Sequence, residues 1–152
     1  MNFKFEYKCY FKYFNKEGYS LLIDNNNTLE ICRLDYLGNI ISNLYYPLNE
    51  SIKKRIKDII SQNREVFNLN SYLYTNNNSD VERVFYFELD TLNRKIETNF
   101  LLSEDKEEYL LLINIFNKIK DELSEIGIIV NLDELNIKEK WFLFLFLLKI
   151  NF

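Results

Sequence analysis

Three carboxylates, Glu88, Asp90 and Glu97, are the residues of this chain whose types and spacing come closest to a catalytic set. Glu88 and Asp90 share one face of a predicted strand, and Glu97 lies on the strand that returns beside it. Carboxylate oxygens are good Mg²⁺ ligands, so this cluster, with Lys95 nearby, could form a metal-dependent hydrolase of phosphodiesters. The alternation of polar and apolar residues along the same strands also predicts these carboxylates as an ordinary hydrated face, which is the interpretation we favour.

Other catalytic chemistries are poorly supported. The chain contains no histidine, which removes the commonest general base near neutral pH and the commonest metal ligand. Cys9 and Cys32 form no C-x-x-C pair, and the glycines are too isolated to form a phosphate-binding loop. We therefore expect no enzyme, no cofactor and no metal site, and we expect both cysteines to be buried free thiols.

The formal net charge of −4 argues against broad nucleic-acid binding, which needs a basic face. An acidic surface can attract a basic protein partner, although mild acidity also serves solubility alone. The chain is rich in Tyr, with 11 residues, and tyrosine is favoured at protein interfaces. We expect partner contacts at tyrosines in or near loops and at an acidic helix start: Tyr36, Tyr45, Tyr46, Tyr72, Tyr74, Glu104, Asp105, Glu107 and Glu108.

The N-terminal third predicts an antiparallel meander. In the stretch 2–14, apolar and aromatic residues occupy odd positions and charged residues even ones, which is the period of a strand with one buried face. Similar alternation predicts strands at 19–24 and 29–32, joined by Asn- and Gly-containing turns. A short fourth strand could begin at Ile40, and the run Tyr45-Tyr46-Pro47 is expected to end the meander. A later hairpin is predicted at 83–90 and 95–100.

Two helices follow from capping signals and apolar spacing. Asn49 is expected to cap a helix over 50–63, in which isoleucines recur at helical spacing opposite a basic face. Ser103 is expected to cap a longer helix over 104–126, with acidic residues at the positive end of its dipole and Gly127 after its end. The basic face of the first helix could contact phosphates, but a hydrated face explains it better.

The segment from Trp141 to Leu148 is apolar on all sides and is a third helix or a buried strand. Such a segment needs cover on every side, so it is central to the core or supports a homodimer. The whole chain 1–152 is expected to be one α+β domain, in which the antiparallel sheet packs against two or three helices.

Its N-terminus lacks an apolar signal-peptide core, and no run is long enough to cross a bilayer. With free thiols, this predicts a cytoplasmic protein without membrane contacts.

The order of elements, a meander, a helix, a hairpin and a C-terminal helix in a small acidic chain, is similar to that of small bacterial immunity proteins and other protein inhibitors. The resemblance lies in the order of elements alone, and it implies no particular functional residue in this chain. Together with the missing catalytic groups, it predicts a non-enzymatic module that binds another protein, such as an immunity protein or inhibitor of a basic toxin or nuclease. The alternatives are the carboxylate hydrolase and a self-associating structural protein.

Overall fold

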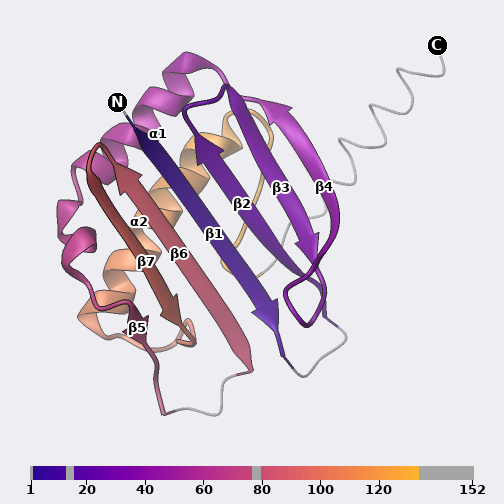
Figure 1. Cartoon of the computed structure of the whole chain (residues 1–152), viewed down its shortest axis with the longest axis vertical. Coiled ribbons are helices and arrows are strands. Elements are labelled where there is room, and N and C mark those ends of the chain that lie inside the picture. Colours follow the sequence, from indigo (N-terminus) through magenta and orange to yellow (C-terminus); the bar gives the residue numbers. More distant parts are fainter. Residues whose placement is uncertain (1, 13–15, 77–79, 134–152) are drawn as a thin grey trace.

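The computed structural model describes residues 2–12, 16–76 and 80–133. Within them the chain forms one seven-stranded sheet with the order β4-β3-β2-β1-β6-β7-β5, and helices lie behind it (Figure 1). The strands are β1 (Phe3–Phe11), β2 (Gly18–Asp24), β3 (Thr28–Leu34), β4 (Ile40–Pro47), β5 (Tyr72–Leu73), β6 (Val81–Leu89) and β7 (Leu92–Thr98). The α+β class is therefore confirmed.

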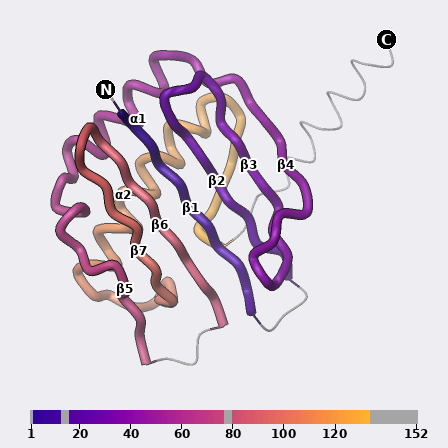
Figure 2. The backbone as a smooth tube through the Cα atoms, in the orientation of Figure 1, coloured from indigo at the N-terminus to yellow at the C-terminus, as the bar shows by residue number. Residues whose placement is uncertain are grey.

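Strand β1 lies in the middle of the sheet, where it pairs antiparallel with β2 on one side and β6 on the other (Figure 2). Its alternation has the predicted effect, because Phe3, Phe5, Tyr7 and Cys9 are each at most 3% exposed and face the helices. The even residues lie on the opposite face and are only partly buried. The helices thus cover one face of the sheet, and the other face is open.

Helix α1 (Glu50–Ser61) begins as predicted, since the Asn49 side chain accepts a hydrogen bond of 2.8 Å from the backbone N–H of Ile52. A short 3-10 helix, η1 (Arg64–Asn68), follows it. The second α-helix, α2 (Glu107–Ser124), packs beside α1. Arg55 of α1 joins them through 2.6 Å contacts to Glu122 and Glu125.

Two expectations about element boundaries were wrong. Helix α2 begins after Lys106, without a side-chain cap, and not after Ser103. Residues 101–104 form a separate turn, in which Glu104 accepts from the backbone N–H of Leu101 at 2.7 Å. Strand β4 is longer than the short strand expected, because Tyr45 and Tyr46 also pair with β3, and the meander ends at Pro47 as predicted.

The sheet was expected to be wholly antiparallel, but β5 pairs parallel to β7. Strand β6 lies between β5 and β7 in the sequence, so β5 and β7 are not joined by a hairpin turn, and their pairing can be parallel. The described residues form seven strands, more than the meander of three or four strands and the hairpin that the sequence predicted.

Cys9 and Cys32 are buried free cysteines, as expected. Neither of the described α-helices combines the length and hydropathy of a bilayer-spanning segment. The expected segment Trp141 to Leu148 lies outside the described residues, so the predicted homodimer contact there stays a prediction.

Candidate protein-binding site

The tyrosines proposed as partner contacts do not form one surface. Tyr36 and Tyr45 lie near β4, whereas Tyr72 and Tyr74 lie at β5, at the opposite edge of the sheet. Six strand-to-strand steps of about 4.8 Å separate the two edges by about 29 Å. Tyr46 is partly buried and packs against the core on the helix side, so less of it is accessible to a partner than of Tyr36 or Tyr45.

At the β5 edge, Tyr74 is held by a carboxylate. Its hydroxyl donates to Glu82 Oε2 at 3.2 Å, and Lys12 Nζ lies 2.8 Å from Glu82 Oε1. Partial burial, and then the negative charge of Glu82, raises the pKa of Tyr74 to about 12, so its hydroxyl stays protonated. The Tyr72 ring, 68% exposed, stacks on the Tyr74 ring with 6.4 Å between centroids. These two rings form an ordered aromatic surface at this edge.

The start of α2 packs directly against β5. The Tyr109 hydroxyl donates to the Leu73 carbonyl at 3.4 Å, and the Tyr109 ring stacks on Phe100 at 4.9 Å. Thr98 of β7 also donates to the Leu73 carbonyl, at 2.6 Å. This packing places the predicted acidic helix start against the helix-facing side of β5, whereas Tyr72 and Tyr74, which alternate with Leu73, lie on the open face of the sheet at the same edge.

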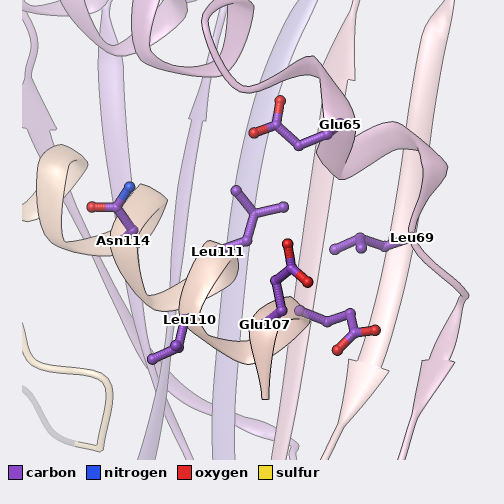
Figure 3. Close-up of a pocket in the computed structure, with 7 residues that line it drawn as sticks. Glu65, Leu69, Glu107, Leu110, Leu111 and Asn114 are labelled. Carbon is purple, nitrogen blue, oxygen red and sulfur yellow. The ribbon is translucent and has the colours of Figure 1, made fainter. Parts of the chain in front are cut away.

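A hollow of about 580 Å³ lies between η1 and the first turns of α2. It is lined by three carboxylates, three leucines and an amide: Glu65, Glu107, Glu108, Leu69, Leu110, Leu111 and Asn114. Figure 3 shows the Glu65 carboxylate above Leu111 and the Glu107 carboxylate below it, with Leu69 to one side. Of the predicted acidic residues, Glu107 and Glu108 therefore line a cavity, and Glu65 joins them from another element.

In the part of the chain that the structure describes, no basic side chain lines this hollow. Within the described ranges, no Lys or Arg forms an ion pair with Glu65, Glu107 or Glu108. The neighbouring Lys106 instead lies over the Tyr109 ring, 5.6 Å from its centroid. Unpaired carboxylates around leucines match a lysine or arginine side chain, whose aliphatic stem packs on apolar atoms while its cation stays polar.

The carboxylates that suggested a hydrolase are not brought together. In the β6–β7 hairpin, Glu97 pairs with Val84 and Glu88 pairs with Asn93, so the two are four positions apart along the strands. Asp90 lies in the tight turn, with a positive φ of 55°. Among the described residues, no three acidic or cysteine side chains are grouped as a metal site would require.

A buried arginine is the polar group that the sequence analysis missed. Arg83 is 1% exposed, and its guanidinium donates to the carbonyls of Phe100 and Leu132, each at 3.1 Å, and to the Tyr7 hydroxyl at 3.0 Å. Its Nη1 lies 2.6 Å from Asp133 Oδ1, which makes no hydrogen bond within the described residues, so this contact is an ion pair. The signal in the sequence is its odd position on the apolar face of β6.

This network fastens the stretch 130–133 over the sheet. The Tyr7 hydroxyl donates to the Leu132 carbonyl at 2.7 Å, and the Tyr19 hydroxyl donates to the Asn131 carbonyl. Burial raises the pKa of Tyr7 and of Tyr19 well above the ordinary value, so both remain donors. Because its donors and acceptors face one another inside the protein, we interpret the network as structural.

No protein-family model matches this chain, and no curated protein matches it.

Proposed function

We propose that this chain is a non-enzymatic module that binds another protein, and that the hollow between η1 and α2 receives a basic side chain of that partner. The observation that carries the proposal is the lining of the hollow, three carboxylates around three leucines with no basic residue among them. A lysine or arginine that enters it would place its stem on Leu69 and Leu111 and its cation between carboxylates.

The surroundings of the hollow support a protein rather than a small cation as the ligand. Leu110 is 49% exposed at its rim, and Tyr72, 68% exposed on the open face of the same sheet edge, extends the surface that a partner could cover. Rigid aromatic side chains with a polar tip are common anchors at protein interfaces. The net charge of −4 adds long-range attraction for a basic protein. A basic toxin or nuclease has this character, and the chain would then act as its inhibitor or immunity protein.

The experiment compares the proteins retained by the tagged chain and by two double variants in a lysate of its own organism. Glu65→Gln with Glu108→Gln removes two carboxylates of the hollow. Asp58→Asn with Asp121→Asn removes the same charge from exposed positions on α1 and α2 outside it. We expect the native chain and the Asp variant to retain the same basic protein, and the Glu variant to lose it.

Salt dependence provides the second measurement on the retained protein. Contacts between exposed charges weaken as the Debye length falls from about 30 Å at 0.01 M to about 8 Å at 0.15 M salt. We therefore expect binding of the basic protein to weaken over this range. Equal retention by both double variants, or a retained partner without basic character, would contradict the proposal.

A further inference from the structure

The outer edge of β4 is a second surface that could bind a protein chain. Among the described residues, β4 pairs with β3 on one side and with no strand on the other. Its apolar side chains are open to solvent, with Ile40 63%, Ile41 50% and Tyr45 60% exposed. An edge strand of this kind offers unpaired backbone groups to another strand.

The hydrogen-bond pattern identifies the groups that face outward. The Leu48 N–H donates to the Asn27 carbonyl at 2.9 Å, so this opposed pair is a hydrogen-bonded one. In an antiparallel ladder such pairs alternate, so Ser42, Leu44 and Tyr46 bond to β3. The backbone N–H and C=O groups of Asn43 and Tyr45 therefore point away from the sheet.

Features that normally prevent an edge strand from pairing with another chain, such as proline and irregular pairing, occur only at the two ends of β4. Pro47 ends the strand, and the pairing register shifts between Arg33 and Leu34, which places an irregularity near Ile41. Between them, residues 42–46 form a regular edge with no Lys, Arg, Asp or Glu. Charged residues are the commonest device by which edges avoid association, and this edge has none.

We propose that β4 pairs antiparallel with β4 of a second copy of this chain, about a two-fold axis at Leu44. In this register Asn43 of each copy is opposite Tyr45 of the other, which gives about four backbone hydrogen bonds between the outward-facing groups. The irregular ends meet each other, since Pro47 is opposite Ile41. The C=O of Pro47 can still accept a hydrogen bond from the N–H of Ile41 in the other copy. Because proline lacks only an N–H donor, every N–H of residues 42–46 keeps its acceptor.

The side chains also complement one another in this register. The two Leu44 side chains meet at the axis on the helix side of the sheet, where Leu44 is only half-buried in one copy. On the open side, the Asn43 amide and the Tyr45 hydroxyl, which bond within one copy at 3.0 Å, can bond between copies. Two chains that each carry a net charge of −4 meet most easily along an uncharged strand, which favours a second copy over a charged partner.

The test is sedimentation velocity of the full chain over a range of concentrations, for the native sequence and two edge variants. Asn43→Pro removes an outward N–H that β3 does not use, so the monomer keeps its ladder while edge pairing is blocked. Tyr45→Lys adds a charge to the edge. We expect a native dimer, and self-association at least about tenfold weaker in each variant.

Tyr36→Lys is the matched control, because Tyr36 is 50% exposed in the turn before β4 and lies outside the proposed pairing. It should leave the dimer unchanged. A native chain that remains monomeric, or a dimer that both edge variants retain, would overturn the proposal; the retained dimer would indicate association through another surface.

The register has its own measurement, cysteine cross-linking under mild oxidation. Leu44→Cys should give a covalent dimer, because the two introduced thiols face each other across the axis. Asn43→Cys should not give a covalent dimer, because the two introduced thiols would be offset by two positions along the paired strands. A reversed result would overturn the axis at Leu44. The strand β4 is one edge of the sheet, and the acidic hollow lies near the other edge. The results of these tests are therefore independent of the proposed function.

Discussion

Replacement of Arg83 by methionine tests the buried network most directly. Methionine fills similar volume but donates no hydrogen bond, so the Phe100 carbonyl, whose residue is fully buried, loses its Arg83 donor. A buried acceptor without a donor costs about 1–3 kcal/mol. The Leu132 carbonyl suffers less, because the Tyr7 hydroxyl still donates to it.

The ion pair adds a smaller amount. Asp133 is 37% exposed, so after loss of Arg83 water can hydrate its carboxylate, and we assign about 1 kcal/mol to this contact. The sum for Arg83→Met is therefore about 3 kcal/mol. For a chain of this length that corresponds to a fall in Tm of about 6–12 °C. Asp133→Asn should cost less, about 1 kcal/mol, because it removes only the carboxylate charge of the ion pair and leaves the hydrogen bonds of Arg83 in place.

The assay is urea unfolding of the native chain, both single variants and the double variant, which together form a double-mutant cycle. We expect the double variant to be no less stable than Arg83→Met, because the aspartate has no remaining partner to lose. Strictly additive costs, or a cost below about 1 kcal/mol for Arg83→Met, would refute the view that the network fastens residues 130–133 to the sheet.

Three further predictions concern the cap, alkaline pH and Tyr74. Asn49→Ala should cost about 1 kcal/mol in urea unfolding, whereas Ser103→Ala should cost almost nothing, because only Asn49 caps a helix; equal costs would contradict this. Burial raises the pKa of Cys9 to about 11, and that of Tyr7 well above its ordinary value, so the unfolded chain loses protons first. Stability should thus fall as the pH rises above about 9 and continue to fall above pH 11, because the pKa of Tyr7 lies well above its ordinary value; urea unfolding at several pH values would show or refute this. Tyr74→Phe should cost about 1 kcal/mol and remove an absorbance transition near pH 12, and an unchanged alkaline titration would argue against its contact with Glu82.

Local patterns were sufficient to predict much of the sheet. Strands β1, β2 and β3 follow from alternation within each strand, and the α1 cap follows from Asn49 and the isoleucines after it. The length of β4 could not be predicted in this way, since its second half depends on pairing with Leu29 and Glu30. Strand β5 has only two residues, and its parallel pairing with β7 depends on the packing of the β6–β7 hairpin between it and β1.

The candidate site was predictable only in parts. Glu107 and Glu108 stood out as an acidic helix start, and Tyr72 and Tyr74 as exposed aromatics. That both sets lie at the β5 edge, on its two faces, depends on the contact of Tyr109 with Leu73, which no local pattern contains. Glu65 was not singled out at all, because η1 has no apolar period that would mark it as part of a cavity.

The central place of β1 has a consequence for the order in which the sheet can be completed. Strand β1 meets β2 across a short connection, but its other neighbour, β6, comes only after β2, β3, β4, α1 and η1 have been synthesised. Until then β1 is the outer strand of a four-stranded meander. The pairing of β1 with β6 closes a long loop of the chain, and contacts between residues so far apart in sequence form slowly. Lys4, Glu6 and Lys8 alternate along it, so during synthesis this temporary edge carries the charges that the permanent edge β4 lacks.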